Sequence, residues 1–367
     1  MDTAQIYTIV NDINSQTMGE SAIQAIDTAS FVAMGSQVLS SSDNTECFLN
    51  TLVQRIARTI IQTRSYKSKM SELAFTDVEW GAIMQKIKVE MPEAVEDVSV
   101  NLVDGESIDQ WIVAKPKAKK KFFVIRSPYD FFITIQRRWL KEAFLSPAEM
   151  ESFIGAVFNE VNNKLELSQE NLGRMSLANF IANVGQNQTY PLLTMYNAKT
   201  GETAPTPTGA LYNEKFMRFA VGEMKMASIR LQEMSTLYNK EGYKRFSNLS
   251  DQFVVTRADF KVAMETQVDY AAYHENYLNV ATDLEVSYWQ NAQTPNNIII
   301  GEGNNTTTVE NVLAVIHDRD AVGTYRKETE VLTTPINARG AYYNTFYHTN
   351  DARFNDMSEN GLVFLLA

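Results

Sequence analysis

Apolar residues recur at helical spacing from Asp43 onward, and this pattern predicts an amphipathic helix capped by Asp43 or Thr45. Arg55 and Arg58 lie off the apolar stripe, so the helix either packs on its own core or docks on another subunit. Residues 1–42 are rich in Ser, Thr, Asn and Ala, and they predict a weakly structured arm with a short helix near Ala22 to Leu39. The stripe consists of Phe48, Leu49, Leu52, Val53, Ile56 and Ile60.

A second helical pattern begins at Ser146, where Ser-Pro-Ala-Glu forms a capping box with Pro at the first helical position. Its apolar stripe continues to Leu165 and predicts a long spine helix. A separate helix is expected to follow and to end near Gly185. The irregular, Pro- and Thr-containing segment 186–209 marks a boundary.

Two segments alternate apolar and polar residues with the period of a β-strand, 86–91 and 130–136. Together they predict the limbs of a long hairpin between Met84 and Ile135. A two-stranded hairpin alone is marginal in water, so a projecting arm of this length implies a partner. The alternative is a solvated loop on a larger sheet.

The segment between these predicted strands is divided by charge, with one acidic and one basic limb. The acidic limb carries Glu93, Glu96, Asp97, Asp104, Glu106 and Asp109, and the basic limb carries Lys115, Lys117, Lys119, Lys120 and Lys121.

The C-terminal half mixes helix and strand patterns. A helix is expected over about 213–238, and short apolar runs predict strands at 253–256, 297–300, 312–316 and 363–366. The second half is therefore mixed α/β, and the fold class of the whole chain is α+β.

Composition excludes several classes of protein. With 33 basic and 44 acidic side chains the net charge is −11, which argues against a main task of neutralising nucleic-acid phosphates. The single cysteine, Cys47, cannot form an intrachain disulfide and suits a reducing compartment. No run approaches ~18 consecutive apolar residues, so no membrane span is expected.

Candidate chemistry is sparse, and we assign no catalytic residue, cofactor or metal site. One segment could still carry catalysis, Asp318-Arg319-Asp320, which follows an apolar run. Two carboxylates at a strand end can hold Mg²⁺ or Mn²⁺ with a substrate phosphate, which suggests a metal-dependent transferase as an alternative function. In the other interpretation, Arg319 neutralises both acids in a structural turn.

Several segments together resemble tailed-bacteriophage major capsid proteins. The clearest are Val-Ile-His-Asp-Arg-Asp-Ala at 315–321, Asn-Ala-Arg-Gly-Ala-Tyr-Tyr-Asn at 337–344, and Asn-Asp-Met-Ser-Glu-Asn-Gly-Leu-Val-Phe at 355–364. Segments 52–56, 85–94 and 121–144 add to the resemblance in the same order along the chain.

This resemblance implies the Hong Kong ninety-seven-type capsid fold. The expected parts are an N-terminal arm with an amphipathic helix at 1–75, an extended hairpin loop at 76–140, a peripheral domain with the spine helix at 141–185, a mixed α/β axial domain at 186–337, and C-terminal strands at 338–367 that return toward the peripheral domain. In that family the extended loop lies over a neighbouring subunit. The charged residues of both limbs are therefore expected at intersubunit contacts.

The implied function is that of a structural capsid protein, not an enzyme, which self-assembles as pentamers and hexamers into the icosahedral head. Expected partners are a portal protein and, because only about 42 residues precede the first strong helix, a separate scaffolding protein. The shell would enclose double-stranded DNA without binding it specifically. It would assemble in the host bacterial cytoplasm and remain in the virion. An encapsulin-type compartment is the alternative function with the same fold.

Overall fold

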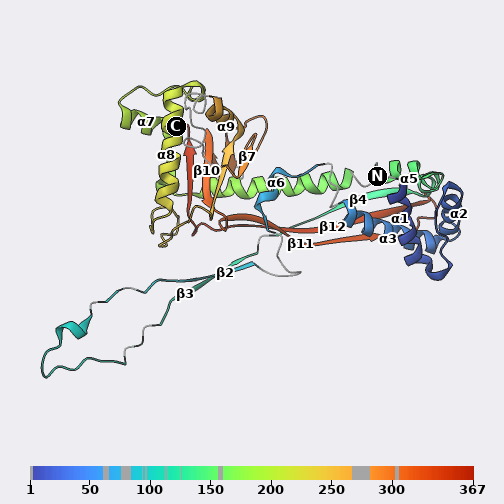
Figure 1. The fold of residues 1–367 in the computed structure, drawn as a ribbon, viewed down its shortest axis with the longest axis horizontal. Helices are drawn as coiled ribbons and strands as arrows, with labels where there is room; N and C mark the ends of the chain where they lie inside the picture. Colours follow the sequence, from blue (N-terminus) through green and yellow to red (C-terminus); the bar gives the residue numbers. More distant parts are fainter. Residues whose placement is uncertain are drawn as a thin grey trace.

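The chain folds into two lobes joined by a long helix and a long sheet, and a hairpin projects from the junction (Figure 1). One lobe is helical and contains the N-terminus, and the other surrounds a five-stranded sheet and contains the C-terminus. The structure is a computed structural model that describes residues 3–60, 66–75, 84–92, 94–95, 97–111, 113, 115–124, 126–155, 160–266, 282–301 and 306–367. Within these residues, no helix is long and apolar enough to cross a membrane.

The helical lobe contains α1 (Thr3–Met18), α2 (Thr28–Val38), α3 (Ser42–Ile60), α4 (Arg137–Ala143) and α5 (Pro147–Ile154). As predicted, α5 begins at the capping box, where Ser146 Oγ accepts a hydrogen bond from the Glu149 N–H. The prediction of a weakly structured N-terminal arm is wrong, because α1 buries Ile6, Val10 and Ile13 in the core of this lobe. These three residues have helical spacing, but the polar residues around them weaken the pattern.

The predicted spine is described in two helices on either side of residues 156–159. α5 ends at Ile154, residues 156–159 lie outside the described part, and α6 (Glu160–Asn183) follows as one helix. Leu165 and Leu177, which the sequence places on two successive helices, both lie on α6. Leu165 packs in the core of the helical lobe and Leu177 packs against the five-stranded sheet, so α6 ties the lobes together.

A four-stranded sheet extends from the junction into the helical lobe, in the order β1-β11-β12-β4. Along β12, Tyr343, Thr345 and Tyr347 are buried, whereas the residues between them are more exposed. One face of this sheet therefore carries the helical core, and the other face is open. The strands are β1 (Ala74–Phe75), β11 (Val322–Thr333), β12 (Tyr342–Asn355) and β4 (Arg126–Gln136).

The projecting hairpin is formed by β2 (Met84–Val89) and β3 (Ala118–Phe123), which pair antiparallel. The prediction that residues 130–136 form its return limb is wrong, because they belong to β4, which pairs with β12. The return strand is the lysine run itself, with Lys86 opposite Lys121. Since three consecutive lysines break the apolar alternation, the sequence pattern did not indicate a strand there.

The five-stranded sheet has the order β5-β13-β10-β6-β7 and is covered on both faces. Helices α7 (Leu192–Thr200), α8 (Glu214–Leu231) and α9 (Ala258–Met264) contribute to the core on one face, and α6 contributes to the core on the other. The strands are β5 (Thr189–Pro191), β6 (Gln252–Arg257), β7 (Leu284–Val286), β10 (Val312–Asp318) and β13 (Gly361–Leu365), and β8 (Ile298–Ile300) pairs separately with β9 (Thr307–Val309).

The last strand differs from its expected place. Segment 338–367 is expected to return toward the helical, peripheral end, and β12 does reach that lobe in the four-stranded sheet. β13, however, lies between β5 and β10 in the five-stranded sheet. Every residue of β13 except Leu365 is buried, so its continuous apolar run requires a sheet that is covered on both faces.

Candidate functional site

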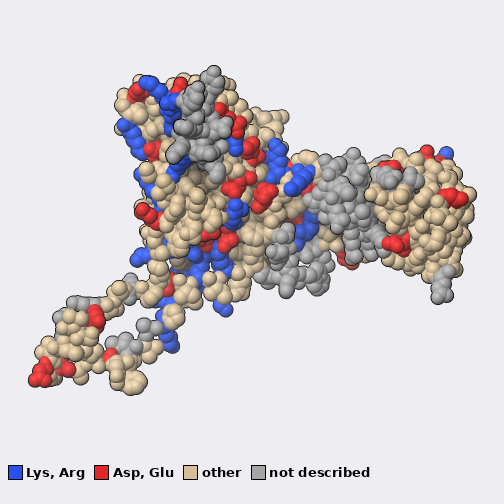
Figure 2. All heavy atoms as spheres, in the orientation of Figure 1, with Lys and Arg blue, Asp and Glu red and all other residues tan. Residues whose placement is uncertain are grey.

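The hairpin carries most of the site residues that the sequence predicts. Beyond β2 and β3 its described part contains one short 3₁₀ helix, Val98–Asn101, and otherwise irregular chain. It extends away from both lobes, with acidic atoms at its far end and basic atoms where it meets the body (Figures 1 and 2). The sequence predicts one acidic and one basic limb, whereas in the structure the charges differ between the far end and the base, where both strands carry lysines, Lys86 and Lys88 on β2 and Lys121 on β3.

The acidic residues of the far end are exposed to solvent. Asp97 caps the 3₁₀ helix by accepting a hydrogen bond from the Ser99 N–H at 3.0 Å, and Asp109 accepts one from the Trp111 N–H at 2.9 Å. Asp104 and Glu106 are also exposed. The remaining two acidic residues, Glu93 and Glu96, lie outside the described residues.

The basic residues divide into two groups. Lys115, Lys117 and Lys120 are exposed. Lys119 is exposed as well, but Lys119 and Lys121 make contacts within their own chain: Lys119 Nζ lies 3.0 Å from Glu90 across the hairpin and 5.1 Å from the centre of the Tyr243 ring.

Lys121 takes part in an ion-pair network at the base of the hairpin, which we call the root cluster: Lys86, Lys88, Lys121, Asp356 and Glu359. Lys88 Nζ and Lys121 Nζ each lie 3.0 Å from Asp356, and Lys86 Nζ lies 2.5 Å from Glu359. The Asp356 side chain is fully buried. These contacts connect both strands of the hairpin to the turn between β12 and β13.

Contacts to Ala321 and Ser358 also hold Asp356 in place, in addition to the lysines. The Asp356 N–H donates to the Ala321 carbonyl at 2.7 Å, and its carboxylate accepts from the Ser358 N–H and hydroxyl. Burial alone would raise the pKa of Asp356, but hydrogen bonds from Ser358 and the adjacent lysine ammonium groups outweigh it. They hold the pKa of this carboxyl well below its usual range, so Asp356 is a permanent anion at neutral pH.

Sequence reasoning did not identify Asp356 and Glu359 as site residues. They are separated by more than two hundred residues from the lysines that they contact, and no local pattern links the two segments. The available signal was the pair of acids between two apolar strands, at the end of the segment that carries the family resemblance.

Arg55 and Arg58 lie in the second half of α3, and their side chains lie outside the described part of the structure. The adjoining first half of the stripe, Phe48, Leu49 and Leu52, is buried in the helical lobe. This agrees with packing on the chain's own core for that half of the helix.

Asp318 and Asp320 do not form a joint metal site. The Asp318 carboxylate is buried and accepts a hydrogen bond from the Asn360 N–H at 3.0 Å, whereas the Asp320 side chain is 67% exposed and lies 3.6 Å from Lys86. Arg319 pairs with Asp283 at 2.8 Å rather than neutralising both acids. Among the residues that the structure describes, no three His, Cys, Asp or Glu side chains are arranged to hold a metal ion.

Burial shifts the pKa values of His317 and Asp318, which are neighbours in β10. The two shifts have opposite effects on how the stability of the fold depends on pH. Burial lowers the pKa of His317 to about 4 and raises the pKa of Asp318 to about 6. His317 packs its ring near those of Phe180 and Phe253, 5.6 and 5.3 Å between centres. Both titratable groups are thus part of the sheet core rather than of a catalytic site.

Comparisons with known proteins agree with the resemblance seen in the sequence. A family model described as Phi29-like phage major capsid protein matches residues 6–365. The chain is 23% identical to the major capsid protein of Bacillus phage B103, with 100% of this chain and 74% of that protein covered. It is 22% identical to the one of Bacillus phage PZA, with 98% and 72% covered.

Solved structures show a similar fold. A chain in the capsid structure of Staphylococcus phage Andhra superposes with a TM-score of 0.54 at 11% identity, covering 82% of this chain and 84% of that one. A chain in the structure of the head fibre and inner core protein gp22 of native bacteriophage P68 gives 0.52 at 12% identity, covering 82% and 85%.

Proposed function

The chain belongs to the family of Phi29-like phage major capsid proteins, and from this premise we propose that its hairpin is an arm that holds neighbouring subunits together. The protein forms the icosahedral head of a phage from many copies of itself and is part of the virion. Its fold is the expected α+β fold of the Hong Kong ninety-seven type. Membership in this family of structural proteins favours the capsid over the metal-dependent transferase and the encapsulin-type compartment.

The arm is proposed on the apolar surface that the hairpin leaves uncovered. Monomeric proteins rarely expose large contiguous apolar patches, and such patches mark interfaces. The far end exposes side chains that are each at least 47% accessible: Val95, Val100, Leu102, Val103, Ile108, Trp111 and Val113.

We assign two roles to the charged residues of the arm: contact with neighbouring subunits and attachment to their own subunit. The exposed acids Asp97, Asp104, Glu106 and Asp109, together with Glu93 and Glu96, and the exposed lysines Lys115, Lys117 and Lys120, are proposed to contact neighbouring subunits. Lys119 and Lys121 are proposed mainly to fix the arm on its own subunit, because their carboxylate partners are within the chain. Arg55 and Arg58 remain candidates for a contact of α3.

The resemblance also supports the domain division 1–75, 76–140, 141–185, 186–337 and 338–367, which we propose with the last strand assigned to the axial part. Portal and scaffolding proteins are proposed partners, and assembly is proposed to take place in the host bacterial cytoplasm. The net charge of −11 supports a shell that encloses double-stranded DNA without binding it specifically.

Replacing residues 91–116 by a two-residue Asn-Gly turn tests the arm. The Glu90 N–H donates to the Lys117 carbonyl at 2.9 Å, so a short turn can close the remaining hairpin there. We expect the shortened subunit to unfold at the same urea concentration as the wild type but to form no shells when co-expressed with the other head proteins. Lys244→Gln, which changes an exposed lysine outside the hairpin, is the control that keeps the arm; shells at wild-type yield from the shortened chain would contradict the proposal.

A further inference from the structure

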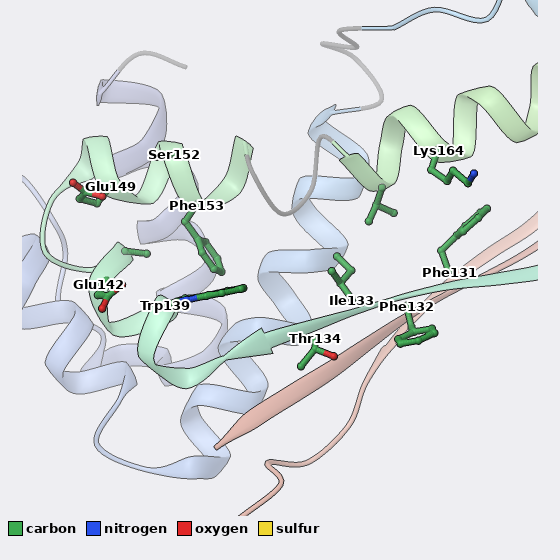
Figure 3. Close-up of a pocket in the computed structure, with 12 residues that line it drawn as sticks. Phe131, Phe132, Ile133, Thr134, Trp139, Glu142, Glu149, Ser152, Phe153 and Lys164 are labelled. Atoms are coloured by element: carbon green, nitrogen blue, oxygen red, sulfur yellow. The ribbon is translucent and has the colours of Figure 1, made fainter. Parts of the chain in front are cut away.

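A layer of ionic side chains lies between the middle of α6 and the four-stranded sheet, where the two lobes meet. The core of the helical lobe reaches α6 at Leu165, and Phe131 points from β4 toward the turn of α6 that carries Lys164 (Figure 3). The core of the sheet lobe reaches α6 again only at Leu177. The side chains between these two cores, which we call the waist layer, are Glu166, Glu170, Arg174, Arg326, Asp351 and Arg353.

Two ion pairs of the waist layer are closed within the subunit. Arg174 Nη2 lies 2.7 Å from Glu170, one turn earlier on α6. Arg326 on β11 lies directly opposite Asp351 on β12, and its Nε lies 2.9 Å from the carboxylate. Buried ion pairs contribute little or nothing to stability relative to apolar residues of the same volume, because both charges lose their hydration. Stability alone therefore does not explain why this layer is ionic.

The third arginine, Arg353, has no carboxylate partner among the described residues. Its Nε is buried and makes no hydrogen bond there, and neither does Thr324 Oγ1, which lies directly opposite on β11. Burial lowers the pKa of Arg353. Burial would lower the pKa of Arg326 too, but the hydrogen bonds and charge of Asp351 outweigh it and raise that pKa. Since buried polar groups are nearly always paired, the layer is not optimised for this one arrangement.

Asp351 lies within reach of both arginines of the sheet. Asp351 and Arg353 are two residues apart on β12, so their side chains share one face of the sheet at a spacing of about 7 Å along the strand. The long side chain of Arg353 can span this distance. If Asp351 exchanged Arg326 for Arg353, the number of ion pairs in the layer would stay the same.

We propose that the waist layer is a two-position joint between the lobes, in which Asp351 pairs with Arg326 in one position and with Arg353 in the other. This inference rests on the proposed assembly into pentamers and hexamers, in which one chain must fit two surroundings. Because each position contains the same number of ion pairs, neither is strongly favoured by electrostatics. A close-packed apolar core at this place would instead favour a single arrangement of the lobes.

Electron cryomicroscopy of shells of the unmodified protein tests the joint directly. We expect Asp351 to contact Arg326 in the subunits of one kind of ring, pentamer or hexamer, and Arg353 in the subunits of the other. The same partner for Asp351 in every subunit would overturn the joint and leave the proposed head protein intact. Shells that do not contain both pentamers and hexamers would instead contradict the assembly on which the joint rests, so the two failures are distinguishable.

Arg353→Gln tests the joint in solution. Because Arg353 has no ion pair in the isolated subunit, the variant should unfold at the same or a higher urea concentration than the wild type. Its yield of closed shells on co-expression with the other head proteins should nevertheless fall several-fold, and Arg353→Lys, which keeps the charge, should restore part of that yield. Arg230→Gln makes the same change at an exposed arginine of α8 and is the matched control.

Two results for Arg353→Gln would overturn the joint. One is a wild-type yield of shells. The other is a fall in the urea midpoint of the subunit as large as that of Arg326→Gln, because Arg353 would then stabilise the isolated subunit rather than a second position of the lobes.

Discussion

The strands of the five-stranded sheet and those of the projecting hairpin differ in how much of their apolar surface is buried. All seven residues of β10 are buried, with Leu313 and Ile316 in the core on one face and Val315 in the core on the other. In the hairpin, Ile87 and Val89 are 55% and 60% exposed, although they occupy the apolar positions of β2. The sheet completes its core within one chain, whereas the hairpin presents its apolar residues to solvent.

The difference shows where each region obtains its stability. Burying a large apolar side chain contributes ~1.5–3 kcal/mol to the free energy of unfolding, and side chains on both faces of the sheet make this contribution. The hairpin has a two-strand ladder, the root cluster and, at its base only, a small apolar cluster in which Phe123 packs against Phe354. We infer that the sheet determines whether the subunit folds, and that the hairpin determines whether subunits join.

The largest expected effect comes from matched truncations in the two regions. Phe364→Ala removes a fully buried ring that packs 5.2 Å from Tyr190, and it should lower the free energy of unfolding by ~3–5 kcal/mol. Phe122→Ala removes a ring that is 56% exposed on β3 and should cost at most ~0.5 kcal/mol. Urea unfolding of unassembled subunits measures both free energies of unfolding. Equal losses in Phe364→Ala and Phe122→Ala would contradict the difference between the sheet and the hairpin.

Acid sensitivity of the sheet tests its buried pair of titratable residues. The pKa of His317 falls from 6.5 to about 4, so the unfolded chain takes up that proton first and stability is lost as pH falls through this window. The pKa of Asp318 rises from 3.8 to about 6, so the folded chain takes up that proton first and stability is gained as pH falls from about 6 to 3.8. In the wild type the effects of His317 and Asp318 on the pH dependence of stability largely cancel.

Asp318→Asn should remove that compensation. Between pH 7 and 4 the variant should lose ~2–3 kcal/mol more unfolding free energy than the wild type, from the roughly two-unit shift of the lost carboxyl. Asp320→Asn, which alters an exposed carboxylate two residues away, is the matched control. Superimposable profiles for Asp318→Asn and the wild type would show that the burial of Asp318 has no energetic effect.

A smaller effect is expected at the root cluster. Asp356→Asn removes the buried anion that two lysines share, and it should cost ~2 kcal/mol, below the ~3–5 of a fully buried pair because Lys121 can turn toward water. Hydrogen exchange in β2 and β3 should rise at the same time. Lys120→Gln, on an exposed lysine of the same strand, is the control. Unchanged exchange in Asp356→Asn would mean that the ladder and the apolar contact of Phe123 hold the hairpin without the root cluster.

A change in salt concentration should have the smallest effect. It should alter the association of subunits rather than their folding. With a net charge of −11 per subunit, like-charge repulsion is screened over about 10 Å at 0.1 M salt. We expect shells to form more readily at moderate than at very low ionic strength, as measured by light scattering. Faster assembly at very low salt would indicate that attraction between oppositely charged limbs and patches dominates.

Local sequence patterns correctly predicted the elements that depend only on residues close to them in sequence. The capping box at Ser146 predicted the start of α5, and the apolar run at 312–316 predicted a buried strand, because each needs only its own neighbours in sequence. The return strand of the hairpin was missed for the opposite reason. Ala118–Phe123 forms a strand because β2 and the carboxylates of the root cluster lie beside it, and neither is near it in sequence.

The sequence by itself determined the α+β class, several helix and strand positions, and the family resemblance. These features depend on residue type and short-range spacing, which the chain carries in every conformation. Only the tertiary structure decided that Asp356 anchors the hairpin, that β13 joins β10 rather than the helical lobe, and that Asp318 and Asp320 face different surroundings. Each depends on contacts between segments far apart in sequence, whose electrostatic and packing energies arise only when the fold brings them together.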